Sequence, residues 1–209
     1  MALILYWRPG TASMAPHAAL AEIGCDYELV LVEREQAQTD ASYLALNPLG
    51  VVPTLVDEAA GRVLTESAAI LLHLGDRYPE ARLAPLDDPF AFAQLQAFTS
   101  HLCSTVHVAH AHGRRGYRWA AEEASFADMK RKVPESVGAC FELIETRMFK
   151  GPWVMGEDYS IADPYLFTLA TWLEGDDVDP ARFPRVAEHR ARMADRASVK
   201  RAIEQEMAA

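Results

Sequence analysis

Short apolar runs separated by turn-forming residues mark the first eighty positions of the chain. The runs are residues 3–5, 27–32, 51–56 and 62–64, and they consist mainly of Val, Ile and Leu. This pattern predicts four short strands. Because only a turn at 57–61 joins the last two runs, we expect them to form an antiparallel hairpin.

Helical segments alternate with these strands. An alanine-rich segment at 14–24 follows Ser13, a short segment covers 42–46, and a third at 66–78 carries apolar residues three or four positions apart. For the polar stretch at 33–40 we predict neither a helix nor a strand. The order strand, helix, strand, helix, strand, strand, helix predicts a mixed α/β sheet of four strands.

A proline-bounded linker at 80–88 divides the chain. Beyond it we expect no strand, because the apolar residues recur at helical intervals. The predicted helices cover residues 90–112, 120–149 with a kink or break at Pro134, a core helix that begins at the capping box 160–163, and 185–195 and 198–206. The sequence thus predicts an α/β domain at 1–79 and an all-helical domain at 89–209.

Composition narrows the classes of function. The formal net charge of −10 argues against binding to nucleic acid or to anionic membranes, which requires a basic surface. The three scattered cysteines suggest no disulfide framework, which fits a reducing compartment. We see no membrane span and no signal peptide, so we expect a cytoplasmic protein.

The junction at residues 3–17 is the first candidate site. A buried strand, a tight turn at Pro9 and Gly10, and Ser13 as the capping residue lead directly into a helix. The first N–H groups of a helix have no partner within it, and the helix dipole adds positive potential. This arrangement favours an anion at the helix N-terminus.

Four motifs occur in order along the chain. They are LYWRPGTASMAPH at 5–17, NPLGVVPTL at 47–55, LTESAAI at 64–70 and SIAD at 160–163. With the two-domain pattern, they resemble the cytosolic glutathione transferases, and the first motif is similar to the bacterial beta class. The resemblance covers nearly the whole chain. It implies a thioredoxin-like N-terminal domain, glutathione as co-substrate without a metal, a homodimer, and transfer of the glutathione thiolate to small hydrophobic or aromatic electrophiles.

The resemblance also implies a glutathione site. Val52, before a cis Pro53, would pair its backbone with the cysteinyl unit of glutathione. Ser67, at the predicted N-cap of the third helix, would hold the γ-glutamyl carboxylate, and Glu66 would meet the α-ammonium group. From the residues alone, a trans proline at a strand edge and an ordinary capped helix remain the alternatives.

The thiol position departs from the beta class. Ala12 stands where those enzymes carry a cysteine, so mixed-disulfide chemistry at this position is not expected. Ser13 is the predicted catalytic residue, because a hydrogen bond from its hydroxyl to the glutathione sulfur favours the thiolate. Tyr6 is the second candidate, with core packing as its alternative.

Two more residues complete the predicted glutathione site. Arg34 is the candidate for the glycine carboxylate, although the neighbouring Glu35 would repel that group. His107 aligns with a histidine that beta-class enzymes place near the thiol. Cys103, one turn earlier, is interpreted as a packing residue.

The predicted electrophile pocket draws on the helical domain. Its candidate residues are His110, Arg114, Tyr117 and Trp172, with an anionic or aromatic electrophile as the expected preference. A solvated loop, and plain packing for Trp172, are the alternatives. The histidines at 107, 110 and 112 share no helical face, so we expect no metal.

Two alternatives to conjugation stay open. One is a glutathione-dependent peroxidase, isomerase or reductive enzyme of the same fold. The other is a glutathione-binding or protein-interaction module that has lost catalysis, for which Ala12 and Glu35 are the motivation.

Overall fold

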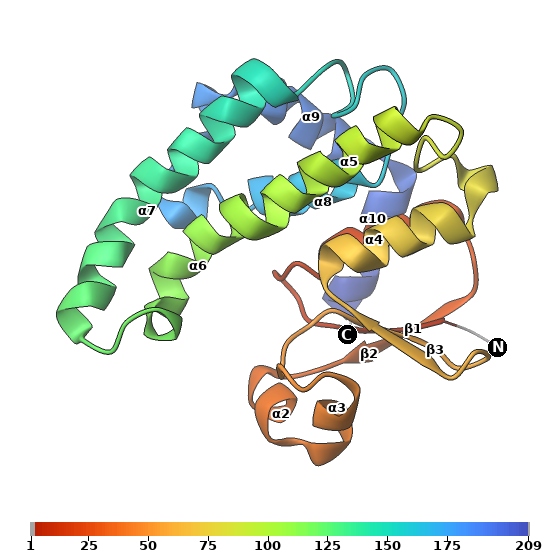
Figure 1. Cartoon of the computed structure of the whole chain (residues 1–209), viewed down its shortest axis with the longest axis horizontal. Coiled ribbons are helices and arrows are strands. Elements are labelled where there is room, and N and C mark those ends of the chain that lie inside the picture. Colours follow the sequence, from red (N-terminus) through yellow and green to blue (C-terminus); the bar gives the residue numbers. More distant parts are fainter. Residues whose placement is uncertain (1–2, 209) are drawn as a thin grey trace. The chain divides into compact units, whose positions relative to one another are not determined.

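The computed structural model describes residues 3–208 of the chain (Figure 1). Its four strands are β1 (Leu3–Trp7), β2 (Tyr27–Leu31), β3 (Thr54–Asp57) and β4 (Arg62–Thr65), in the sheet order β2-β1-β3-β4. β1 pairs in parallel with β2 and antiparallel with β3, and β3 and β4 form the hairpin. The predicted mixed sheet is confirmed.

β1 is the central strand on which the site is built. Leu3, Leu5 and Trp7 alternate with partly exposed residues and are buried, because successive side chains point to opposite faces of a sheet. The ring of Trp7 lies 6.1 Å from that of His17 on α1 (Met14–Ile23), so this face of β1 is covered by α1. Tyr6, on the other face, packs toward the α2–α3 segment.

The polar stretch at 33–40 is a helix, which the sequence did not predict. α2 (Arg34–Thr39) and α3 (Ala41–Leu46) lie on the side of the sheet opposite to α4 (Ser67–Arg77), as Figure 1 shows. Of the six residues of α2, Ala37 is the buried one. A single apolar contact gives no periodic pattern, so the helix depends on packing that the sequence does not reveal.

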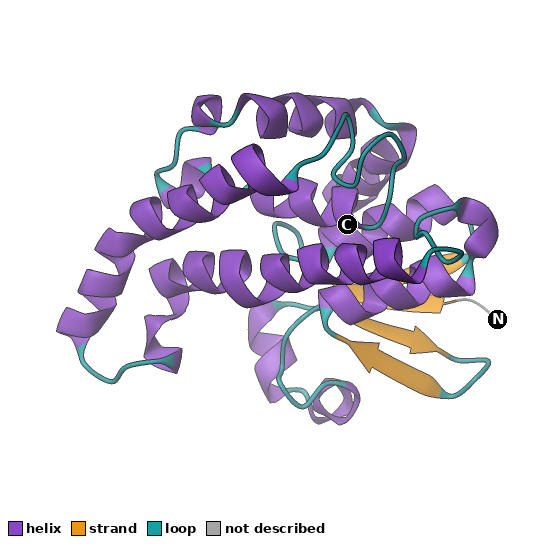
Figure 2. Cartoon of the chain, turned by 45° about the horizontal axis from the view of Figure 1, so that its top comes forward, coloured by secondary structure: helices purple, strands orange, loops and turns teal. Residues whose placement is uncertain are grey.

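The remaining helices follow the linker (Figure 2). They are α5 (Pro89–His101), α6 (His107–Arg115), α7 (Glu123–Leu143), α8 (Ala162–Ala170), α9 (Pro184–Asp195) and α10 (Ala197–Ala208). A turn of π-helix, Leu102–Val106, joins α5 to α6 inside the segment predicted as one helix. Pro134 lies within α7 and does not end it. None of the described helices is both long and apolar enough to cross a bilayer.

α8 is the core helix that the sequence predicted, since all of its residues are buried. The capping box at its start is formed through Asp163. One carboxylate oxygen accepts the backbone N–H of Ser160 (2.7 Å), and the other accepts that of Val154 (2.8 Å). His189 Nε2 lies 3.0 Å from Asp163, so this buried carboxylate also ties α8 to α9.

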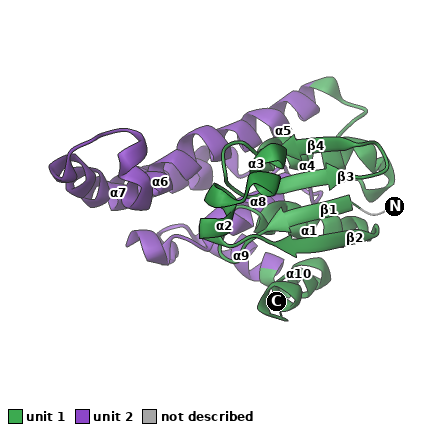
Figure 3. Cartoon of the chain, turned by 90° about the horizontal axis from the view of Figure 1, so that it is seen from below, with its two compact units in different colours: residues 1–89, 194–209 green, residues 90–193 purple. Residues whose placement is uncertain are grey.

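The chain divides into two compact units (Figure 3). Unit 1 comprises residues 3–89 and 194–208, and unit 2 comprises residues 90–193. The prediction had assigned all of 89–209 to the helical domain, whereas α10 groups with unit 1.

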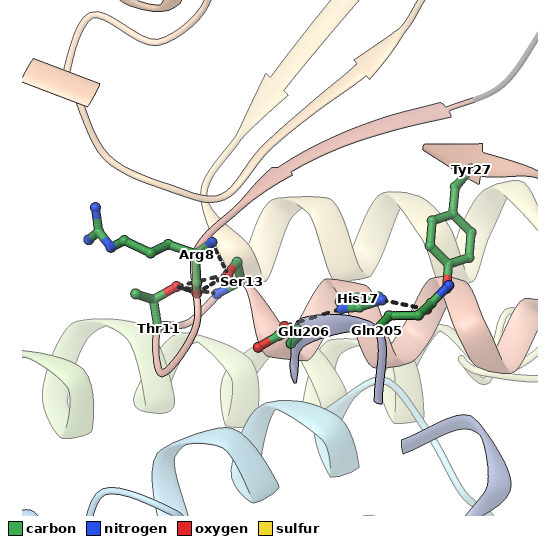
Figure 4. Close-up of polar contacts among 7 residues, drawn as sticks. All are labelled: Arg8, Thr11, Ser13, His17, Tyr27, Gln205 and Glu206. Carbon is green, nitrogen blue, oxygen red and sulfur yellow. Dashed lines mark hydrogen bonds and ion pairs between the residues drawn. The ribbon is translucent and has the colours of Figure 1, made fainter. Parts of the chain in front are cut away.

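Polar contacts join α10 and the residue before it to α1. His17 on α1 places Nδ1 3.1 Å from a carboxylate oxygen of Glu206 and Nε2 3.0 Å from the amide oxygen of Gln205 (Figure 4). Arg196 Nε, just before α10, donates to Glu22 at 2.7 Å. These contacts connect residues that are far apart in the chain. No local sequence pattern therefore reveals that α10 groups with unit 1.

Candidate functional site

The turn between β1 and α1 is closed by its own hydroxyl groups (Figure 4). The backbone N–H of Arg8 donates to Ser13 Oγ at 3.2 Å, and Ser13 Oγ lies 3.1 Å from the carbonyl oxygen of Arg8. Thr11 Oγ1 lies 2.7 Å from the same carbonyl oxygen and 2.8 Å from Ser13 Oγ. Gly10, at φ +66°, provides the left-handed backbone of the turn.

Ser13 occupies the N-cap position, but its side chain does not cap the helix. Its hydroxyl makes no cap hydrogen bond and points back into the turn, where Ser13 is fully buried. Thr11, which the sequence analysis did not single out, is partly exposed and is the member of the hydroxyl pair nearer to solvent. Two hydroxyl groups can donate to the carbonyl oxygen of Arg8, and one hydrogen bond is enough to satisfy it.

The start of α4 lies against this turn. Ser67 is the first residue of α4 and not its cap, which corrects the predicted cap position. Its hydroxyl donates to the carbonyl oxygen of Ala12 at 3.3 Å, so the turn and the N-terminus of α4 are adjacent. Glu66, exposed and at φ +71°, adopts a backbone conformation that is costly for a residue other than glycine. Such outliers concentrate at ligand-binding sites.

The loop before β3 is anchored by side chains from α3 and its end. Asn47 Nδ2 donates to the carbonyl oxygen of Val51 (2.7 Å) and to Thr54 Oγ1 (3.1 Å). The hydroxyl of Tyr43 donates to the same carbonyl oxygen at 2.6 Å. The predicted cis bond between Val52 and Pro53 is present.

Gly50 fixes this loop against α2. Its φ is +60°, and a Cβ at this position would lie 2.7 Å from the carbonyl oxygen of Ala37. A side chain would therefore displace the loop that carries Val52, which explains the glycine of the second motif.

Two guanidinium groups form a positive pair near the turn. Burial lowers the pKa of Arg8, and the nearby Arg34 lowers it further, whereas Glu33 opposes the shift. Arg34 itself is exposed on α2. The sequence indicates Arg34 alone for the glycine carboxylate, and Arg8 adds a second cation on the same unit.

Tyr6 is partly buried and packs against the core of unit 1. Its ring lies 5.5 Å from the ring of Tyr43, and it contacts the buried cluster of Val32, Ala37 and Tyr43. This is the packing interpretation of Tyr6 that the sequence had left open.

In unit 2, two predicted histidines meet the predicted tryptophan. The ring of His110 stacks on Trp172 at 4.4 Å between centroids, and the ring of His107 meets it edge-on at 5.2 Å. Arg115 donates to His107 Nε2 at 3.0 Å. Burial lowers the pKa of His107 to about 4, and the positive charge of Arg115 contributes to the shift.

His110 has a partner that the sequence analysis missed. Its Nδ1 lies 2.7 and 2.9 Å from the two carboxylate oxygens of Asp176. Trp172 and Asp176 are four residues apart in the turn that follows α8, just as His107 and His110 are three apart on α6. This spacing places both members of each pair on one side of their element.

The remaining predicted residues of the electrophile pocket lie at the surface of unit 2. Arg114 and Tyr117 are exposed, and Trp119 packs edge-on against His112 at 4.5 Å. Cys103 Sγ donates to the carbonyl oxygen of Ser100. Within residues 3–208, no group of three or more His, Cys, Asp or Glu side chains is arranged to hold a metal ion.

Comparison with known proteins gives a consistent result. The family model "Glutathione S-transferase, N-terminal domain" matches residues 1–76, and "Glutathione S-transferase, C-terminal domain" matches residues 112–192. A relative, the glutathione S-transferase GstA of Escherichia coli O157:H7, is 27% identical over 97% of this chain and 98% of its own.

Solved structures agree across the full length. A glutathione transferase homologue from Sulfitobacter, with bound glutathione, is 44% identical with a TM-score of 0.94, and 99% of each chain is covered. A beta-class glutathione S-transferase from Sphingomonas chungbukensis is 30% identical with a TM-score of 0.85, over 97% of this chain and 98% of the other. The chain therefore belongs to the cytosolic glutathione S-transferase family, with a thioredoxin-like N-terminal domain and a helical C-terminal domain.

Proposed function

We propose that this glutathione transferase conjugates glutathione to small hydrophobic or aromatic electrophiles, and that unit 1 activates the thiol with a hydroxyl group in place of a cysteine. The observation that carries the proposal is the Thr11–Ser13 hydroxyl pair, which shares one carbonyl acceptor at the N-terminus of α1. Ala12 between them has no nucleophilic group.

The shared acceptor makes one hydroxyl proton available. The carbonyl oxygen of Arg8 can accept from either Thr11 or Ser13, so one hydroxyl can turn toward a thiolate while the other keeps the carbonyl paired. Ser13 is the residue predicted from the sequence, and Thr11 is the partly exposed member that would reach the sulfur. A hydrogen bond to the charged form, together with the helix N-terminus, lowers the pKa of a thiol.

The other contacts in the proposed glutathione site follow from the resemblance. The backbone of Val52, before Pro53, would pair with the cysteinyl unit, and the free N–H groups at Ser67 would hold the γ-glutamyl carboxylate. Glu66 would accept the α-ammonium group. Arg34, with Arg8 beside it, would bind the glycine carboxylate, because two guanidinium groups offset the repulsion from Glu35.

In unit 2 the proposed electrophile pocket contains His110 and Trp172, with Arg114 and Tyr117 at its mouth and His107 edge-on against Trp172. We also propose a homodimer. The family resemblance supports this proposal, and Leu49 in unit 1 and Phe90 in unit 2, which are 67% and 74% exposed, are apolar side chains that a second copy could cover. The molar mass in solution, measured by light scattering, tests this, and a monomeric mass would contradict it.

Conjugation of glutathione to an aryl chloride tests the catalytic proposal. We expect Thr11→Val and Ser13→Ala to lower kcat/KM by about tenfold each, since a hydrogen bond to a charged group is worth about 1.5–3 kcal/mol. Arg34→Ala should instead raise the KM for glutathione. Thr146→Ala is the matched control, because it removes an exposed hydroxyl that is bonded to its own helix.

The assay also separates the alternatives. Calorimetric binding of glutathione without turnover of any electrophile would indicate a binding module. Turnover of a peroxide or of an isomerisable substrate without conjugation would indicate the second class of enzyme. Full conjugation by the Thr11→Val, Ser13→Ala double variant, with an unchanged pH dependence, would contradict the role of the hydroxyl pair.

A further inference from the structure

The two histidines on α6 share one aromatic neighbour but have opposite polar partners. Both rings contact Trp172. His107 accepts a hydrogen bond at Nε2 from the cation Arg115, whereas His110 presents Nδ1 to the carboxylate of Asp176. A cation favours the neutral ring, and a carboxylate favours a ring that carries protons.

The carboxylate determines where His110 carries its proton. Both groups that face Nδ1 are acceptor oxygens of Asp176, so Nδ1 bears hydrogen. Nε2 is then the nitrogen that is left to face a substrate. Among the residues that the structure describes, Nε2 has no hydrogen-bond partner, and 20% of the side chain is exposed.

Two contacts hold the ring of His110 in place. Asp176 is 8% exposed, and its backbone N–H donates to the carbonyl oxygens of Trp172 and Leu173, which fixes the carboxylate at the end of α8. Trp172 then stacks on the ring with an interplanar angle of 29°. A turn of π-helix, a feature frequent at functional sites, directly precedes α6. A ring held at one nitrogen, with the other available, has the geometry of a general acid or base.

We propose that His110 donates a proton to the electrophile when conjugation places negative charge on one of its oxygen atoms, as in addition to an α,β-unsaturated carbonyl compound, and that Asp176 is its positioning residue. This inference rests on the proposed function, because it requires a glutathione thiolate as the nucleophile. It extends that function by assigning the proton donor and the residue that orients it.

The reaction balances without a redox partner. The thiolate sulfur forms a bond to the β-carbon, and the π electrons of the C=C bond move through the carbonyl group to its oxygen. His110 Nε2–H gives its proton to this oxygen as the charge develops, and the resulting enol becomes the carbonyl product by exchange with water. His110 then takes a proton from solvent, which had received the thiol proton. The net change is addition of S–H across C=C.

His107 is not suited to this step. Its Nε2 accepts a hydrogen bond from Arg115, so no proton sits on that nitrogen. Burial and the same guanidinium group keep the pKa of His107 near 4, well below its ordinary value. The two neighbouring histidines are therefore distinguished by their partners rather than by their place on the helix.

Two substrates separate the proton-transfer step from thiol activation. An enone needs a proton on the developing oxyanion, whereas an aryl chloride releases chloride without one. We expect His110→Gln to lower the ratio of kcat/KM for the enone to that for the aryl chloride by about a hundredfold, the lower end of typical general acid catalysis. Asp176→Asn should lower this ratio by about tenfold, and Asp176→Glu should restore part of it. His73→Gln, an exposed histidine on α4, is the control.

The pH profile gives a second readout. The titratable and charged groups that face His110 are Asp176 and His107, and Arg115 acts through His107. In the wild-type protein, the ratio of enone to aryl chloride kcat/KM should depend on pH, because only the form of His110 with a proton on Nε2 can act as the donor. In His110→Gln this ratio should not depend on pH.

The wild-type protein also tests the proposal without any substitution. A larger solvent deuterium isotope effect on enone turnover than on aryl chloride turnover is expected, and equal effects would overturn the proposal. A ratio unchanged in both His110→Gln and Asp176→Asn would likewise overturn it and leave the proposed function intact. Failure of the wild-type protein to conjugate either substrate would overturn the proposed function itself, so the two failures are distinguishable.

Discussion

His17 in unit 1 and His110 in unit 2 each pair with a carboxylate, but their surroundings differ. The side chain of His17 is fully buried, and both of its ring nitrogens meet oxygen atoms, of Glu206 and Gln205. The side chain of His110 is 20% exposed and uses only Nδ1 for Asp176. The first pair fastens α10 to α1, and the second leaves a nitrogen for chemistry. Both histidines pair with a carboxylate, so the pair does not distinguish them. A structural histidine has partners at both ring nitrogens, whereas a candidate catalytic one has a partner at only one.

The largest expected effect comes from removing the buried ring. His17→Ala leaves the Glu206 carboxylate without its partner and opens a cavity, and loss of one member of a buried pair costs about 3–5 kcal/mol. His110→Ala should cost less than half of that, because water can reach the partly exposed site. Denaturant unfolding of both variants measures the difference. Equal losses would show that the two pairs are equally structural.

The effect expected at His107 is smaller than that of His17→Ala, and it depends on pH. The pKa of His107 in the folded protein is about 4, against an ordinary value of 6.5, so the unfolded chain binds the proton more tightly. The neutral ring therefore contributes stability above pH 6.5 that is lost as the pH falls toward 4. A shift of this size corresponds to about 3 kcal/mol.

His107→Gln isolates this contribution. Between pH 6.5 and pH 4, the free energy of unfolding of the wild-type protein should fall more steeply than that of the variant. Parallel curves would mean that His107 titrates normally in the folded protein. NMR titration of the His107 ring gives the same answer directly.

The smallest effect is expected at an exposed ion pair. Lys132 and Glu135 pair on the surface of α7, with side chains that are 62% and 72% exposed. Exposed pairs of this kind contribute little, because water and salt screen them. Lys132→Ala should leave the unfolding midpoint within experimental scatter. A shift as large as that of His17→Ala would show that burial does not determine how much a charged pair stabilises this protein.

The sequence predicted the elements of the sheet and the family better than the polar pairs. Apolar runs located all four strands, and local motifs indicated the cis bond before Pro53 and the capping Asp163. α2 was missed because its one buried residue gives no pattern.

The partners of the histidines could not be found from the sequence for a different reason. Asp176 lies 66 positions from His110, and Glu206 lies 189 positions from His17. Neither pair leaves a local pattern. Thr11 was overlooked because its importance comes from the shared carbonyl of Arg8, which only the folded turn reveals.

The central claim is that hydroxyl groups of the first turn stabilise the glutathione thiolate. Its most direct test is a pH titration of thiolate absorbance for glutathione bound to the wild-type protein and to the Thr11→Val, Ser13→Ala double variant. We predict that the thiol pKa of bound glutathione lies below the ordinary thiol value of about 8.5 in the wild-type protein and returns toward it in the variant. An equally low thiol pKa in both proteins would contradict the claim.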